Sequence, residues 1–313
     1  MTKKPTRTSR EPGRSAANTP LEVVDPRWLG KALALCLGVA LLCAYLTACL
    51  LFYQGLWQLV LHPSHTVERT LANVGIAFTP VRFGDFDTGQ PHLTGWWIPA
   101  QSVPRTDLAP HSANLTVLYL HGGSGSLSDT LPALALLHRT GFNIFAIDYR
   151  GFGGSDTSVH PDAERMQQDA EAALDYLVTT QHTSQSSIIP MGTGLGASLA
   201  VQLARAHSEL PGIILDNPDP DPAGTAAAQS SRLIPVRLLF GSRFAIAAPL
   251  AKLSTPKLLF AGGSNVSSAD ESRIETLYLN AASPKYTVVL PPNSTDAARE
   301  DALDRFLDDL HMH

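Results

Sequence analysis

The chain is poor in charged residues and in cysteine, and each shortage excludes some classes of protein. Only 16% of its 313 residues are charged, whereas 44% are hydrophobic, which excludes a disordered chain. Its three cysteines, Cys36, Cys43 and Cys49, all lie in one apolar stretch near the N-terminus. The rest of the chain therefore forms no disulfide, which suits an oxidising compartment without proving one. Histidine is also missing from the whole interval between His207 and His311.

The few charges are unevenly distributed. Residues 1–31 hold seven Lys or Arg against three Asp or Glu, whereas the remaining residues hold sixteen against twenty-five. Nucleic-acid binding needs a concentrated basic face, so an acidic body argues against a nucleic-acid partner. The sequence also has no P-loop ending and no His, Asp or Glu cluster with metal-ligand spacing. We therefore expect no metal and no cofactor.

A long segment without charge is the strongest signal in the chain. No Asp, Glu, Lys or Arg lies between Ala32 and Leu61, and the apolar residues 32–53 are long enough for a helix to cross a bilayer. Trp28 at one end and Tyr53 at the other suit the two membrane interfaces. Because the basic residues precede this segment, we predict a cytoplasmic N-terminus and an extracytoplasmic body in the inner or plasma membrane. The alternative is a helix buried in a globular core.

The sequence Leu46-Thr47-Ala48-Cys49 allows a second mode of attachment, because it resembles a bacterial lipobox. Cleavage there would make Cys49 a lipidated N-terminus, although the apolar residues that follow continue the span. Either mode makes the membrane a partner. The predicted organisation is a disordered basic cytoplasmic tail over residues 1–27, a transmembrane and juxtamembrane segment over 28–61, and a body over 62–313.

In the body, continuous apolar strands alternate with amphipathic helices. The pattern predicts strands at 81–86, 93–98, 115–120, 143–148, 187–191, 212–216, 257–261 and 287–290. The first two should form a hairpin, and helices are expected at 127–140, 161–178, 195–206, 269–279 and 296–310. Such alternation indicates a mostly parallel sheet with helices on both faces. Residues 218–254 break it, and we predict a lid insertion there, over the carboxyl ends of the strands.

Short motifs in this order resemble the α/β-hydrolase superfamily, and within it the membrane-anchored serine aminopeptidase-like or acyl hydrolase branch. The motifs are Leu61-His62-Pro63, Gly95-Trp96-Trp97-Ile98-Pro99, Leu120-His121-Gly122-Gly123, Asp148-Tyr149-Arg150-Gly151-Phe152-Gly153-Gly154-Ser155 and Met191-Gly192-Thr193-Gly194-Leu195-Gly196-Ala197. The resemblance implies an α/β-hydrolase fold. It also implies a serine on a tight strand-to-helix turn, activated by a histidine that an acid holds.

The residues expected at the three catalytic positions are not those of a hydrolase. The turn reads Gly-Thr-Gly-Leu-Gly, so Gly194 stands where the nucleophilic serine should be. Asn265 occupies the place of the acid, and Ser294 lies in the stretch where the histidine is expected. A triad acts as a unit, so this chain is predicted to be a degenerate hydrolase.

Other groups near the expected site remain candidates. The resemblance implies that the backbone amides of Gly123 and Leu195 correspond to an oxyanion hole, which here could persist as a small anion- or carbonyl-binding nest. It also implies a supporting, structural role for His121.

Three further polar residues are pocket candidates. Ser198 and Ser124 are the candidates for a displaced nucleophile, although Ser198 lies a helical turn beyond the elbow and Ser124 suits a loop. Asp216 ends a strand where some hydrolases place their acid, or it caps a turn. The Gly-x-Gly-x-Gly run also loosely matches a dinucleotide-binding loop, with Asp216 as its acidic residue.

Three hypotheses follow for the function. The first is a membrane-anchored protein without a working triad that binds an apolar small molecule or a protein partner. The second is an active serine hydrolase of ester, thioester or peptide bonds with a displaced nucleophile. The third is a structural part of an envelope assembly.

Overall fold

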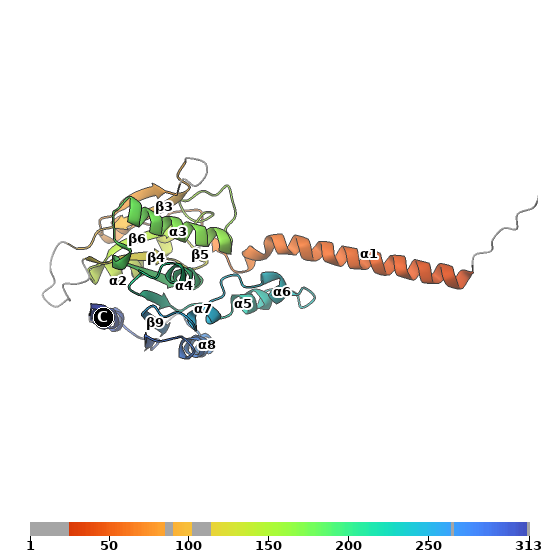
Figure 1. Cartoon of the computed structure of the whole chain (residues 1–313). Helices are drawn as coiled ribbons and strands as arrows, with labels where there is room; N and C mark the ends of the chain where they lie inside the picture. Colours follow the sequence, from red (N-terminus) through yellow and green to blue (C-terminus); the bar gives the residue numbers. More distant parts are fainter. Residues whose placement is uncertain (1–24, 85–89, 102–113, 264–265, 312–313) are drawn as a thin grey trace, which may run out of the picture. The chain divides into compact units, whose positions relative to one another are not determined.

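The computed structural model describes residues 25–84, 90–101, 114–263 and 266–311. The chain divides into two compact units, Met1–Leu51 and Phe52–His313. In the first, helix α1 begins at Pro26 and runs without a break to Gly55, which takes it into the second (Figure 1). Its most apolar window has a mean hydropathy of 2.5, and 6% of that window is buried. One long apolar N-terminal helix is therefore present, of the kind that anchors a protein in a membrane or serves as a signal sequence.

The C-terminal unit, Phe52–His313, is built on an eight-stranded sheet with the order β10-β9-β8-β7-β4-β6-β3-β2. The strands are β2 (Thr79–Phe83), β3 (Leu93–Ile98), β4 (Thr116–Leu120), β6 (Asn143–Asp148), β7 (Ile188–Thr193), β8 (Ile213–Asp216), β9 (Lys257–Gly262) and β10 (Lys285–Leu290). Strand β3 pairs antiparallel with both β2 and β6, and the other described pairings in this sheet are parallel. The mostly parallel sheet is confirmed, and so is the β2–β3 hairpin.

Helices cover both faces of this sheet (Figure 1). One face buries apolar side chains of α3 (Ala163–Thr179), α4 (Gly196–Ala206) and α8 (Ser268–Leu279). The other buries those of α2 (Leu131–Arg139) and α9 (Asp296–His311). Strand β4 is buried along its whole length because it contributes to both layers. Because β4, β7 and β8 run parallel, their carboxyl ends lie at the same edge of the sheet.

Two helices begin later than the pattern predicts. Residues 127–140 form a short 3-10 helix, η4 (Leu127–Asp129), and then α2, instead of one helix. Ser126 caps η4, and Pro132 in the first turn of α2 favours a new start. Helix α3 likewise begins at Ala163, because Asp162 accepts hydrogen bonds from two backbone N–H groups as its N-cap.

The predicted lid insertion folds as three short helices after β8. They are α5 (Pro222–Ala228), α6 (Val236–Phe240) and α7 (Ala247–Leu250). Helix α7 packs on α4, and α5 packs on the 3-10 helix η1 (Leu56–Leu59) that follows α1. A second 3-10 helix, η2 (Leu71–Val74), precedes the sheet, and η5 (Gln185–Ser187) leads into β7.

A two-stranded sheet that the sequence did not predict joins residues far apart in the chain. β1 (His62–Pro63) pairs in parallel with β5 (Ser124–Gly125). The His62 N–H donates to Gly123 O at 2.7 Å, and the Ser64 N–H donates to Gly125 O at 2.9 Å. The segment that follows η1 is thus hydrogen-bonded to the loop after β4.

Candidate active site

The turn between β7 and α4 has the backbone of a nucleophile elbow. Gly194 has a φ of +54°, in the left-handed region. A Cβ at Gly192 would lie 2.3 Å from Gly196 O, and one at Gly196 would lie 2.3 Å from Leu120 O. Only glycine fits at those two positions. At Gly194, by contrast, a Cβ would lie 3.6 Å from the nearest atom, Gly122 Cα, which leaves room for a side chain that this chain does not have.

The two candidate oxyanion-hole residues lie side by side at this turn. A Cβ on Gly123 would lie 2.8 Å from Leu195 Cδ1 and 2.6 Å from Val60 O. Among the described residues, neither the Gly123 N–H nor the Leu195 N–H donates a hydrogen bond to another protein group. Two backbone donors are therefore available beside Gly194. A donor pair of this kind can bind a carbonyl oxygen or an anion without performing chemistry.

Asp216, at the end of β8, forms an ion pair with Arg299 in α9. Arg299 Nη1 lies 2.7 Å from Asp216 Oδ2 and Nη2 lies 3.3 Å from Oδ1, so the contact is bidentate. The guanidinium also lies over the Phe260 ring, 5.0 Å from its centroid. Burial raises the pKa of Asp216, and the charge of Arg299 opposes that rise. The backbone oxygen of Asp216 accepts from the Gly194 N–H at 3.1 Å, which places the ion pair directly beside the elbow.

Asn217 continues this cluster on the next residue. Its φ of +47° turns the chain sharply, and its side-chain amide pairs with both backbone groups of Gly262 at 2.8 and 2.9 Å. Asn217 Nδ2 also donates to Asp216 Oδ1 at 3.0 Å. The carboxylate of Asp216 is therefore engaged by Arg299 and Asn217, and no histidine contacts it in the described part of the chain. Sequence reasoning missed Arg299, because nothing local marks a residue 83 positions away as a partner.

The other two predicted triad positions are Asn265 and Ser294. Asn265 lies outside the described residues. Ser294 is half-buried in the turn before α9, where its N–H donates to Pro291 O at 2.9 Å. His207 lies at the end of α4, and its Nε2 is 2.7 Å from Glu171 Oε2.

Neither candidate serine has an atom within 4 Å of the position that a Cβ at Gly194 would take. Ser198 is buried in α4, and its hydroxyl donates to Leu195 O at 2.8 Å. Ser124 is exposed in β5. Ser198 contributes to a cavity of about 810 Å³ lined by α3, α4, the turn after α6 and residues 53–61, and Gly194 is not among its lining residues.

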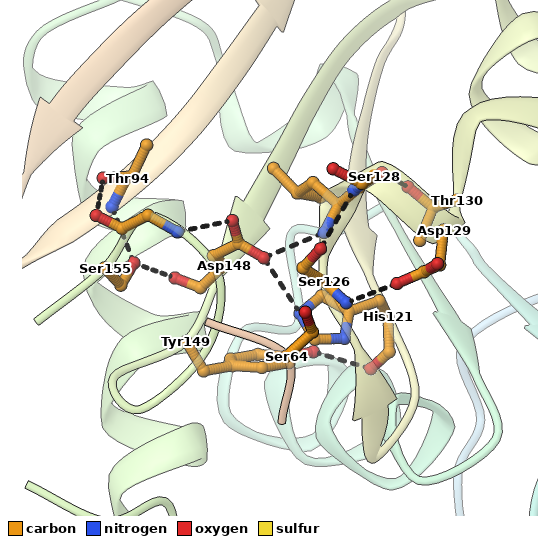
Figure 2. Close-up of polar contacts among 12 residues, drawn as sticks. Ser64, Thr94, His121, Ser126, Ser128, Asp129, Thr130, Asp148, Tyr149 and Ser155 are labelled. Atoms are coloured by element: carbon orange, nitrogen blue, oxygen red, sulfur yellow. Dashed lines mark hydrogen bonds and ion pairs between the residues drawn. The ribbon is translucent and has the colours of Figure 1, made fainter. Parts of the chain in front are cut away.

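A second polar cluster surrounds the buried pair His121 and Asp148 (Figure 2). Asp148 Oδ1 accepts from the Leu127 N–H at 2.9 Å, and Oδ2 accepts from the Gly154 N–H at 3.2 Å. Ser155 donates its hydroxyl to Asp148 O at 2.5 Å. Asp148 thus fastens the loops after β4 and β6 to each other, which is a structural role.

His121 is held in one orientation within this cluster. Its Nδ1 lies 2.7 Å from Gly122 O, so Nδ1 carries a proton, since a carbonyl only accepts. Its Nε2 lies 3.7 Å from Asp148 Oδ1, too far for a hydrogen bond. The Tyr149 ring lies tilted against the imidazole, with the ring centroids 4.6 Å apart, and its hydroxyl donates to His121 O at 3.0 Å. Burial lowers the pKa of His121 and raises that of Asp148.

Within the described residues, no three His, Cys, Asp or Glu side chains are grouped so as to hold a metal ion.

Comparison with known proteins agrees with this architecture. Residues 111–239, less than half of the chain, match the family described as Serine aminopeptidase, S33. The fold resembles that of an esterase from Pyrococcus furiosus, with a TM-score of 0.58 at 19% identity over 80% of this chain and 99% of the esterase. An alpha-beta hydrolase from Vibrio vulnificus gives a TM-score of 0.54 at 20% identity, over 78% of this chain and 82% of that one. The C-terminal unit therefore has the α/β-hydrolase fold.

Several sequence relatives are proteins named as uncharacterized. YfhR of Salmonella typhi is 32% identical over 107 residues, which is 34% of this chain and 34% of YfhR. The chain thus spans about a third of that relative's length. A protein of Mycobacterium tuberculosis is 29% identical over 222 residues, 69% of this chain and 74% of that protein.

Proposed function

We propose that this chain is a membrane-anchored α/β-hydrolase-like protein that binds a ligand or partner and does not hydrolyse it. The observation that carries the proposal is Gly194. The elbow holds its strained backbone and leaves room for a side chain, but there is no hydroxyl at its apex. The carboxylate of Asp216 is engaged by Arg299 instead of an imidazole. Without nucleophile and base, only binding by backbone donors is left.

The ligand chemistry follows from what remains at the turn. The N–H groups of Gly123 and Leu195 offer two donors, and the neighbouring side chains of Leu195 and Leu61 are apolar and buried. These features suit a carbonyl oxygen or an anion attached to an apolar group.

A fluorophosphonate probe tests the absence of hydrolytic activity, because it labels activated serines covalently. We expect the purified full chain to remain unlabelled, and the Gly194→Ser variant to remain unlabelled too, since no base would activate the new hydroxyl. Robust labelling of the unchanged chain would refute the proposal. Its loss in Ser198→Ala or Ser124→Ala would then establish the alternative, a serine hydrolase with a displaced nucleophile.

The membrane anchor is the second part of the proposal. It assigns residues 1–27 to a cytoplasmic tail, 28–61 to the spanning and juxtamembrane segment, and 62–313 to an extracytoplasmic body. The length and apolarity of α1 support it. The same helix continues past Cys49 to Gly55, which favours a span over cleavage at the lipobox. Intact mass and resistance to alkaline extraction test this: a chain that begins at Cys49, or that is released in soluble form, would contradict a spanning helix.

A further inference from the structure

Among the described residues of the C-terminal unit, the lid carries the most exposed leucines. Leu233 is 80% exposed and Leu238 is 79% exposed. Both lie around α6, which turns Val236 and Phe240 inward and leaves Leu238 outward. Large apolar side chains exposed together mark a contact surface more often than an ordinary protein surface.

Arginines surround these leucines. The sequence has no Asp or Glu from Pro222 to Ala269, while Arg232 and Arg237 are exposed beside the two leucines. Arg237 is paired with Asp221 at 2.7 Å but remains 65% exposed. Apolar tips among cationic side chains are typical of segments that lie in the interface of an anionic bilayer. We call Arg232, Leu233, Arg237, Leu238 and Arg243 the lid patch.

The lid patch is joined to the residue where the apolar segment ends. Arg243 donates to the Tyr53 hydroxyl at 2.5 Å, and its guanidinium lies 4.9 Å from the centroid of the Tyr53 ring. The same guanidinium donates to Leu239 O and Phe240 O at the end of α6. Tyr53 is thus tied directly to the lid.

The chain between Tyr53 and the sheet edge is also short. Only eight residues separate Tyr53 from His62, and four of them form η1, so even a fully extended segment would reach no more than about 30 Å. A chain that spans the membrane up to Tyr53 would therefore emerge close to the lid.

On this basis we infer that Leu233 and Leu238 insert into the interface of the bilayer that holds α1, with Arg232 and Arg237 of the lid patch against anionic lipid phosphates. This inference rests on the membrane anchor proposed above. The lid would then be a second, peripheral contact with the membrane, in addition to α1.

The test places a fluorophore at each leucine of the full chain. Cys36, Cys43 and Cys49 are changed to Ala, and Leu233→Cys or Leu238→Cys is labelled with an environment-sensitive dye. The protein is reconstituted in vesicles of phosphatidylglycerol and phosphatidylcholine that contain a spin-labelled lipid quencher. The matched control is Leu279→Cys, because Leu279 is 78% exposed at the C-terminal end of α8, toward the amino ends of the strands.

We expect a blue shift and strong lipid quenching at positions 233 and 238 and neither at 279. Equal, weak quenching at all three positions would overturn the inference, provided that the protein resists alkaline extraction from the vesicles. Dyes at 233 and 238 that are shielded from aqueous iodide without lipid quenching would also overturn it, and would indicate a protein contact. Release of the protein by alkali would instead refute the anchor.

The charge requirement has its own control. Arg232→Gln combined with Arg237→Gln should lower the partition of the lid dyes into anionic vesicles by roughly fivefold for each arginine. Arg305→Gln, in an equally exposed helix position at 76% exposure, should leave the quenching unchanged. Equal quenching in the lid double variant and the control would exclude the anionic lipid from the inference.

Discussion

Two regions at the same edge of the sheet differ in which parts of a catalytic site they contain. The elbow at Gly194 keeps the backbone of a catalytic turn and has no reactive side chain. The cluster at His121 and Asp148, by contrast, has a histidine and an acid, but both are buried and bound to the loops around them (Figure 2). The comparison shows that close packing around glycine and buried hydrogen bonds can maintain the backbone of such a site. This backbone does not depend on reactive side chains being present.

The largest expected effect is a steric loss of stability, which should differ between the glycines of the elbow. Gly196→Ala would press a Cβ to 2.3 Å from Leu120 O, so we expect a loss of about 3 kcal/mol or more in unfolding free energy. Gly194→Ala meets no atom closer than 3.6 Å and costs only the left-handed backbone, about 1–2 kcal/mol. Denaturant midpoints of the full chain in detergent measure both. Equal losses would show that the elbow is not under the described constraint.

The next effect concerns the buried acid. In Asp148→Asn, one of the two backbone N–H groups at Leu127 and Gly154 must face an NH₂ group, which costs about 2–3 kcal/mol. Asp156→Asn is the control, because Asp156 is more exposed and forms its ion pair with His92 near the surface, so we expect less than about 1 kcal/mol. Thermal unfolding compares the two. A smaller loss at Asp148 than at Asp156 would contradict a structural role for the cluster.

The ion pair beside the elbow should show coupling. Arg299→Gln leaves Asp216 buried beside Asn217 without its countercharge, so we expect a loss of about 2 kcal/mol at neutral pH. Combined with Asp216→Asn, the loss should shrink, which a double-mutant cycle detects as a coupling of about 1–2 kcal/mol. Arg305→Gln serves as the control, since its pair with Asp301 is exposed on α9. Strictly additive losses for Arg299 and Asp216 would mean that the pair contributes nothing.

The smallest effect is a pH dependence. Burial lowers the pKa of His121 in the folded state below its ordinary value of about 6.5. As the pH falls below 6.5, the unfolded chain takes up a proton that the folded chain does not. The contribution of His121 to stability is therefore complete above about pH 6.5. Below that pH the stability declines by at most about 1.4 kcal/mol per pH unit. His121→Gln should flatten the decline between pH 7 and pH 5. The raised pKa of Asp148 acts in the opposite direction, and the charge of His121 opposes that rise. An unchanged slope in the variant would contradict a neutral, buried His121.

Most of the fold could be read from apolar patterns. Runs such as Asn143–Asp148 are buried on both faces, and this pattern depends only on local sequence. The division at Thr130 escaped prediction because a Ser–Asp capping box and a proline compete with helical spacing there. The β1–β5 pairing escaped it because two-residue strands carry no periodicity.

The site was predictable only where glycine is required by the backbone. The elbow glycines were located from sequence because steric need and sequence motif coincide. The contacts of Arg299 with Asp216 and of Arg243 with Tyr53 were not predicted. The local sequence around a residue does not indicate a partner that is distant in the chain. The lid patch is likewise visible only once burial distinguishes Val236 from Leu238.

The pairing of Arg299 with Asp216 has an evolutionary consequence. To acquire a working acyl-transfer site, this chain would need a hydroxyl at 194, an imidazole after β10 and a free carboxylate to orient it. The guanidinium now satisfies the carboxylate that lies nearest the elbow, so removing it first costs stability and adding the other groups first brings no rate. Each single step toward a working triad is therefore neutral or harmful, so selection for activity would favour none of these steps.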